Sequence, residues 1–167
     1  MRKMKTHCLA GLAASAAVGP AMSGCESGAP SRPSIPTLTI NAHVWSVELA
    51  VTARQRYDGL SGRPRIGDKS GMLFIYPTQQ VLDFCMRGCP NPIDIAFIDS
   101  NRRIVRIHTM QPEPPDFAGR AAYSSDSPAQ YAFETAGGAL GAAGVKVGDV
   151  VTFSADIPEA SKAQAGP

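Results

Sequence analysis

The chain has 167 residues, of which 44% are hydrophobic and 18% are charged, and its formal net charge is +2. A chain of this length suits a single domain with one buried core. Because the charge is close to zero and the basic residues form no stripe, nucleic-acid binding is excluded as an expected function.

The N-terminus has the features of a bacterial lipoprotein signal peptide over residues 1–24. Arg2, Lys3 and Lys5 provide a positively charged start. The apolar run at residues 8–18 (CLAGLAASAAV) follows, and it is too short to span a bilayer as a stable helix.

The quartet Met22-Ser23-Gly24-Cys25 resembles a lipobox, where a signal peptidase cleaves before a lipid-modified cysteine. We therefore expect Cys25 to be lipidated and to anchor the protein to a membrane, because several acyl chains hold a protein far more firmly than one. Glu26 stands where aspartate would retain a lipoprotein in the inner membrane, so the periplasmic side of the outer membrane is favoured in a diderm cell. An ordinary secretory signal with an incidental cysteine is the alternative.

Cleavage before Cys25 would remove three basic residues and leave 13 basic and 14 acidic residues, a net charge of −1. Residues 25–36 are rich in Ser, Pro and Gly, which is typical of a flexible tether. Residues 158–167 show a similarly weak hydrophobic pattern and are expected to form a flexible tail. The folded domain is therefore predicted over residues 37–157.

Short runs rich in Val, Ile, Phe and Tyr recur through this domain, and their length and composition favour strands over helices. We expect strands at residues 37–40, 44–51, 71–76, 81–86, 95–99, 104–109, 129–134 and 150–154.

Two segments interrupt the strands. Thr52 is suited to cap a short helix over residues 53–58, which would end at Gly59. The glycine-rich residues 136–144 predict one more poor helical turn around Leu140. Many short strands with few helices predict a mainly β (α+β) single small domain, built on a curled antiparallel or barrel-like sheet with one or two short helices.

Four motifs in this region resemble, in order and spacing, the bacterial and archaeal domain of unknown function 192. They are Arg56-x-x-Gly59-Leu60-x-x-Arg63, Gly71-Met72-Leu73-Phe74, Phe84-x-Met86-Arg87 and Pro92-Ile93-Asp94-Ile95-Ala96-Phe97-Ile98-Asp99. The resemblance implies a small, mostly β domain, often exported or lipidated, with no agreed biochemical function.

The chain departs from that family pattern at the third motif. The family's usual Phe-Trp-Met-Lys-Asn-Thr reads here Phe84-Cys85-Met86-Arg87-Gly88-Cys89, and Ser61 replaces a methionine. If the family's tryptophan and asparagine help to form a shared pocket, the pocket of this member is expected to be smaller or differently closed.

Cys85 and Cys89 are the two thiols that remain once Cys8 is cleaved off and Cys25 is lipidated. An oxidising envelope and a turn at Gly88 favour a local disulfide between them. Two reduced core thiols, or a redox or metal pair, are the alternatives.

Met86, His108 and Met110 are soft ligand types like these thiols, which makes copper binding a further alternative. The simpler interpretation places Met86 in the core and His108 at a strand end. Asp94, Asp99 and Glu134 are candidates for general acid–base chemistry, because carboxylates in unlike environments hold different pKa values.

Asp94 lies between two isoleucines, so we expect partial burial and a guanidinium partner, with Arg87, Arg56 or Arg63 as candidates. A structural ion pair that braces strand ends is the alternative to a functional one. Asp99 begins a predicted hairpin turn.

The sequence contains no phosphate-binding loop, no His-Glu-x-x-His, no Gly-x-Ser-x-Gly and no zinc quartet, so no cofactor or metal is expected. The favoured function is a lipid-anchored envelope module that binds a small molecule or an envelope protein. Its site is expected at the long loop 111–128 and the rim around Arg87 and Asp94. The rival function is a small hydrolytic envelope enzyme that uses Asp94, with Arg87 as an electrostatic clamp.

Overall fold

The computed structural model describes residues 34–117, 119 and 121–163. The expected signal peptide, the lipidation site Cys25 and residues 25–33 of the expected tether lie outside the described residues. No helix in the described part of the chain is long and apolar enough to cross a membrane.

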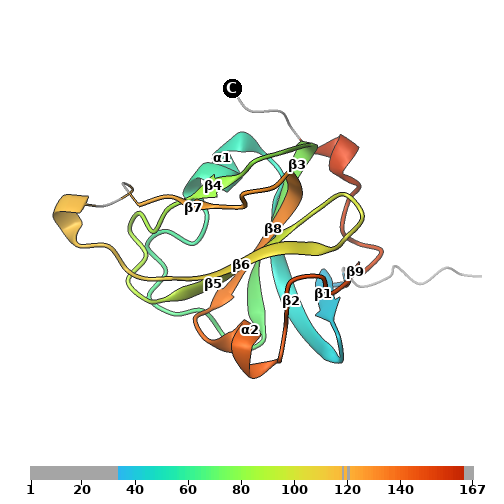
Figure 1. Ribbon diagram of the computed structural model, residues 1–167, viewed down its shortest axis with the longest axis horizontal. Coiled ribbons are helices and arrows are strands. Elements are labelled where there is room, and N and C mark those ends of the chain that lie inside the picture. The colour runs from blue at the N-terminus through green and yellow to red at the C-terminus, as the bar shows by residue number, and fades with distance from the viewer. Residues whose placement is uncertain (1–33, 118, 120, 164–167) are drawn as a thin grey trace, which may run out of the picture. The chain divides into compact units, whose positions relative to one another are not determined.

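Seven strands form one curled sheet in the order β6-β5-β8-β3-β2-β1-β9 (Figure 1). A two-stranded sheet pairs β4 with β7. The strands are β1 (Thr37–Ile40), β2 (His43–Ala50), β3 (Ser70–Gln80), β4 (Asp83–Phe84), β5 (Ile93–Ile98), β6 (Ile104–Met110), β7 (Tyr123–Ser124), β8 (Ala129–Ala136) and β9 (Val151–Phe153).

The two edge strands of the large sheet meet at one end. Arg103 and Val150, just before β6 and β9, form an antiparallel bridge. Next to it, the N–H of Val151 donates to the carbonyl oxygen of Arg102 at 2.8 Å, and the N–H of Ile104 donates to that of Asp149 at 3.0 Å. The prediction of a mainly β domain with a barrel-like sheet is therefore confirmed.

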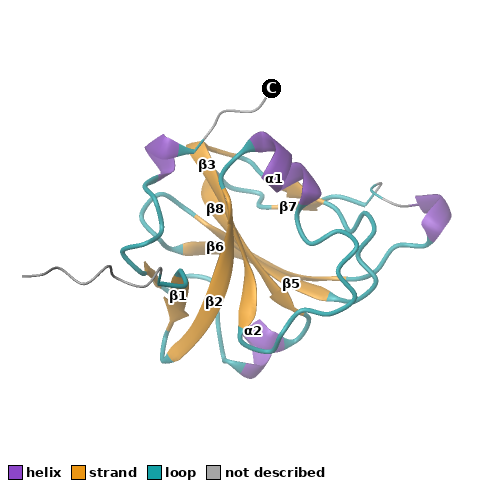
Figure 2. Cartoon of the chain, turned by 180° about the vertical axis from the view of Figure 1, so that it is seen from behind, coloured by secondary structure: helices purple, strands orange, loops and turns teal. Residues whose placement is uncertain are grey.

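Most strand pairs are antiparallel, but β2 and β3 run parallel, with Val47 opposite Gly71. Parallel neighbours need a crossover connection, and the helix α1 (Ala53–Asp58) lies in it (Figure 2). The side chain of Thr52 accepts a hydrogen bond from the N–H of Gln55 and completes a capping box, so the predicted helix has its predicted cap. The sheet is thus mixed rather than wholly antiparallel.

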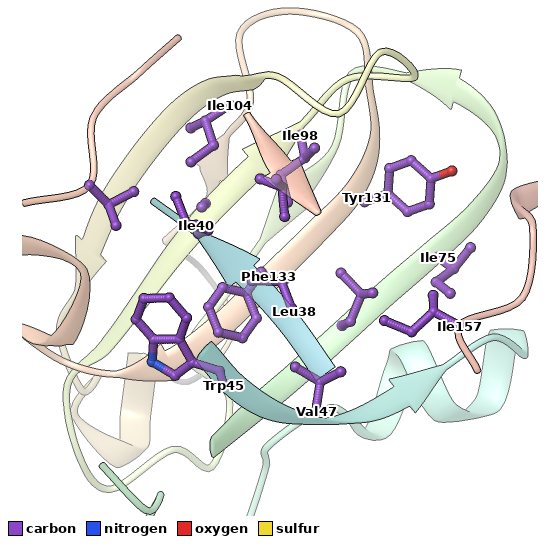
Figure 3. Close-up of a cluster of buried hydrophobic side chains, with 14 of the residues drawn as sticks. Leu38, Ile40, Trp45, Val47, Ile75, Ile98, Ile104, Tyr131, Phe133 and Ile157 are labelled. Carbon is purple, nitrogen blue, oxygen red and sulfur yellow. The ribbon is translucent and has the colours of Figure 1, made fainter. Parts of the chain in front are cut away.

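Strand residues alternate between the two faces of the sheet and build two clusters. The inner cluster lies inside the curl and takes residues from all seven strands, among them Trp45, Val47, Tyr131 and Phe133 (Figure 3). The outer cluster covers the other face with Phe74, Phe97 and Ala132, together with Leu60, Leu82 and Met86 from connecting segments.

Two expectations about local structure differ from the observed fold, and one is met. The segment 81–86 contributes only the two residues of β4, which pair with the unexpected strand β7. The helix α2 (Ala139–Ala142) is a single turn around Leu140, as predicted. Residues 158–163 do not extend as a flexible tail, because Ala160 and Ala163 are buried in the inner cluster.

Candidate functional site

A cavity of about 230 Å³ opens between α1, β3 and β4, and we call it the Arg87 cavity. Its lining comes from four parts of the chain that are distant in sequence. The lining residues are Arg56, Tyr57, Asp58, Gly59, Leu60, Ser61, Phe74, Tyr76, Asp83, Phe84, Cys85, Arg87, Cys89 and Glu134.

Arg87 is held in this cavity by a neighbouring tyrosine. Its guanidinium carbon lies 3.9 Å from the centre of the Tyr57 ring, and its Nη2 donates to the carbonyl oxygen of Tyr57. A guanidinium on an aromatic face gains electrostatic attraction and is held in one orientation. Within the part of the chain that the structure describes, no ion pair of Arg87 is found.

Arg56 has a second, structural task. Its Nη1 donates to the carbonyl oxygens of Val51 at 2.8 Å and Ile75 at 3.0 Å, and its guanidinium lies over the Tyr76 ring at 4.8 Å. These contacts tie α1 to the end of β2 and to β3. Arg56 therefore positions the helix that carries Tyr57.

Glu134 is the buried carboxyl of the cavity, and only 4% of its surface is exposed. It lies on β8, between β5 and β3, on the face that carries Ala132, because Phe133 points into the inner cluster. Burial raises the pKa of Glu134 to about 8, so the group is protonated at neutral pH and acts as a neutral donor and acceptor. Burial also raises the pKa of Tyr76 to about 12.

Cys85 and Cys89 both line the cavity as free thiols, so the predicted disulfide is not formed in this structure. The turn itself is present, because Gly88 has a φ of 65° and the N–H of Cys89 donates to the carbonyl oxygen of Met86 at 3.1 Å. Cys89 packs partly against the outer cluster, whereas Cys85 is exposed. Burial, with a smaller contribution from the charge of Glu134, raises the pKa of the Cys89 thiol to about 11, which makes it a poor nucleophile at neutral pH.

The expected binding loop 111–128 lies beside two residues that line this cavity, Arg87 and Cys85. A methyl group placed on Gly119 would lie 3.6 Å from the Cβ of Arg87 and 3.8 Å from the Sγ of Cys85. The carboxylate of Glu113 accepts hydrogen bonds from the backbone N–H groups of Gly119 and Ala121, which fixes the loop at this point. The loop therefore passes beside Arg87 at Gly119.

Asp94 is not part of that site. It is buried, with 1% of its surface exposed, as predicted, but the expected guanidinium partner is wrong. Its Oδ1 accepts from the hydroxyl of Thr109 at 2.7 Å, and its Oδ2 accepts from the backbone N–H of Leu140 at 2.9 Å. Neutral donors on β6 and α2 satisfy the carboxylate, so Asp94 braces the fold at the helical turn.

Two other candidates, Arg63 and Asp99, are also structural. Arg63 forms an ion pair with Glu48, which lowers the pKa of the Glu48 carboxyl through the hydrogen bonds from Arg63. Asp99 stabilises its hairpin turn, because its Oδ1 accepts from the N–H groups of Asn101 and Arg103.

His108 and Met86 have structural contacts of their own. The Nε2 of His108 lies 2.8 Å from the carbonyl oxygen of Ser124, and Met86 is 1% exposed in the outer cluster. Among the described residues, no group of three or more His, Cys, Asp and Glu side chains is placed to hold a metal ion. The copper alternative therefore gains no support.

Sequence reasoning missed the aromatic residues of the site. Tyr57 and Tyr76 hold the two arginines, but the Arg87–Tyr57 contact joins residues 30 positions apart. Such a pair leaves no local pattern, because it exists only once α1 and the turn after β4 are brought together.

The comparisons with known proteins agree with the fold. The family model of DUF192, described as an uncharacterised ACR, matches residues 36–153. No curated protein gives a significant match.

Similar folds are found among solved structures, including those of two proteins. One is a candidate transcription regulator from Sinorhizobium meliloti 1021, at 29% identity and a TM-score of 0.65, covering 73% of this chain and 93% of that one. The other is a protein of unknown function from Novosphingobium aromaticivorans DSM 12444, at 29% identity and a TM-score of 0.64, covering 70% and 83%. Since the family model spans well over half of the chain, the protein belongs to the domain of unknown function 192 family.

Proposed function

We propose that this protein is a lipid-anchored module of the cell envelope that binds a small organic anion in the Arg87 cavity. One observation carries the proposal: a cavity of about 230 Å³ presents the guanidinium of Arg87 beside a buried carboxyl that is protonated at neutral pH. Ligand sites typically combine an apolar lining with a few placed polar groups, and Phe74, Phe84 and Leu60 supply the apolar part.

Arg87 favours an anion because most of its hydrogen-bonding capacity remains for a ligand. A guanidinium has five N–H donors, and the described contacts of Arg87 use one of them, toward the carbonyl oxygen of Tyr57. Carboxylates and phosphates accept two parallel bonds from such a group. Glu134 would not repel the ligand at neutral pH, since burial raises its pKa to about 8 and its carboxyl is then mostly uncharged.

Binding is favoured over the hydrolytic alternative by the positions of the candidate groups. Asp94 lies away from the cavity with both oxygens occupied, so it cannot act together with Arg87. The Cys89 thiol keeps its proton at neutral pH, so it does not offer a ready nucleophile. The envelope part of the proposal rests on the signal-like residues 1–24 and the lipobox-like Cys25.

A thermal-shift series tests the binding proposal. Membrane-extracted protein is melted with acetate, lactate, succinate, citrate or inorganic phosphate, because a ligand that binds only the folded state raises the Tm. We expect at least one of these anions to stabilise the wild type, and the effect to disappear in Arg87→Gln. Arg106→Gln is the matched control, because Arg106 lies on β6, is half-exposed and pairs with Asp126.

If none of the anions changes the Tm, or if Arg87→Gln and Arg106→Gln respond as the wild type does, the Arg87 cavity is not an anion site.

A further inference from the structure

A second and larger cavity, of about 630 Å³, lies at the other end of the sheet, and we call it the Trp45 cavity. It opens between the start of β2, the residues before β3 and the turn α2. It shares no residue with the Arg87 cavity. In both ribbon views α1, which lines the Arg87 cavity, and α2, which lines the Trp45 cavity, lie at opposite ends of the sheet (Figures 1 and 2).

The two walls of this cavity differ in character. On one wall, His43 and Trp45 are two residues apart on β2, and their ring centroids are 6.0 Å apart. The opposite wall consists of glycines and alanines at 136–139, 142 and 143. Aromatic rings facing small side chains leave flat surfaces, which favour a flat apolar ligand over a branched one.

The indole N–H of Trp45 gives the cavity a directed polar group. Trp45 is only 3% exposed, and it packs edge-on against Phe133 at the margin of the inner cluster (Figure 3). Within the described residues, no protein atom accepts a hydrogen bond from this N–H. In the same part of the chain, every side-chain nitrogen or oxygen that is fully enclosed has a hydrogen-bond partner. The N–H must therefore reach solvent, and the cavity is the opening that Trp45 lines.

A nearly buried donor without a protein acceptor is favourable to a ligand that brings an acceptor. The charges on the wall are balanced, because Asp68 and Lys69 are neighbours on the same segment. The cavity thus selects a ligand by its hydrogen-bond acceptor for the indole N–H and not by its net charge.

From these features we propose that the Trp45 cavity is a second ligand site, which takes a planar aromatic compound carrying a carboxylate or carbonyl oxygen. The ring lies against His43 and the small-residue wall, and the oxygen accepts the indole N–H of Trp45. A volume of about 630 Å³ accommodates a ligand of two or three fused rings.

Trp45 makes the test specific, because it is the only tryptophan of the chain. In ¹⁵N-labelled protein it gives a single indole ¹H–¹⁵N signal. We expect titration with 2-naphthoate to move this signal saturably, with the proton shifted downfield by the new hydrogen bond. Cyclohexanecarboxylate carries the same acceptor without a planar ring, and it should leave the signal in place at equal concentration.

Two variants separate the contributions. Ala142→Leu extends an exposed residue of α2 toward the cavity with a good helix former, and we expect the naphthoate-dependent shift to disappear. Ala155→Leu adds the same side chain at an exposed turn residue that does not line the cavity, and it should bind as the wild type does. Trp45→Phe keeps a ring but removes the donor, so calorimetry should show affinity lower by about fivefold.

Three results would overturn the proposal: no saturable shift with 2-naphthoate, an equal shift with cyclohexanecarboxylate, or unchanged binding in Ala142→Leu. Arg87→Gln should bind 2-naphthoate normally. Loss of binding in that variant would place the ligand in the Arg87 cavity and would also overturn the proposal.

Discussion

The buried carboxyl of Glu134 should make the stability of the protein fall as the pH rises. Its pKa is raised by burial from 4.5 to about 8 in the folded state, so between these values the folded chain holds a proton that the unfolded chain has released. Unfolding free energy then decreases with pH, by about 1.4 kcal/mol per pH unit from this one group. The loss is complete above a pH of about 8, where both states are ionised, and it totals roughly 5 kcal/mol.

Replacing the carboxyl by an amide should remove that slope. We expect Glu134→Gln to be close to the wild type in stability near pH 5 and progressively more stable than the wild type toward pH 8, by about 1.4 kcal/mol per unit. Glu134→Leu should lack the slope as well, whatever its absolute stability. Because both variants lose the slope, the readout does not depend on how well either side chain packs.

Urea denaturation at a series of pH values, followed by the fluorescence of Trp45, measures these slopes. Trp45 is 3% exposed in the inner cluster, so its emission should change on unfolding. Parallel stability profiles for the wild type and Glu134→Gln would refute the argument. They would mean that the carboxyl ionises in the folded protein as it does in the unfolded one.

Three further predictions concern the fold and the anchor. Asp94→Ala removes an acceptor of two hydrogen bonds at a buried position and should lower the unfolding free energy by about 3 kcal/mol. Urea melts measure this loss, and a change below about 1 kcal/mol would contradict the bracing role of Asp94. Gly71→Ala would place a Cβ 2.2 Å from the backbone oxygen of Glu134 and should lower the unfolding free energy by about 3 kcal/mol or more. The control Gly141→Ala meets open space and should not destabilise the protein, so equal urea melts for the two variants would contradict this prediction. Cys25→Ala should abolish metabolic labelling by an acyl precursor and partition into membranes, and label that persists in the variant would show that the lipid is elsewhere.

The structure explains why the motif Gly71-Met72-Leu73-Phe74 begins with a glycine. Gly71 lies where the parallel pair of β2 and β3 meets β8, and Val47 and Thr135 are its partners in register. The backbone of Glu134 approaches so closely that no side chain fits. The sequence marked the motif, but only the packing of three strands explains it.

The candidate site was predicted in part. Arg87, the two cysteines and Glu134 line one cavity, and Gly119 of the loop 111–128 lies beside Arg87 and Cys85. Asp94 was placed there as well, because an acid between isoleucines suggests burial with a guanidinium. Burial followed from the local pattern, but the partners did not, since they lie 15 and 46 residues away along the chain.

By itself, the sequence determined what depends on neighbours along the chain. The helix at 53–58 formed where Thr52 and Gln55 could cap it, and the turn at Gly88 formed where a left-handed residue was available. The strands largely followed β-branched and aromatic runs.

Tertiary structure alone decided the parallel pairing of β2 with β3, the burial of Ala160 and Ala163, and the two cavities. Each of these depends on which distant segments the curled sheet brings together. A hydrogen bond or an apolar contact between such segments is stabilising only after the whole sheet has closed, so no local pattern in the chain encodes it.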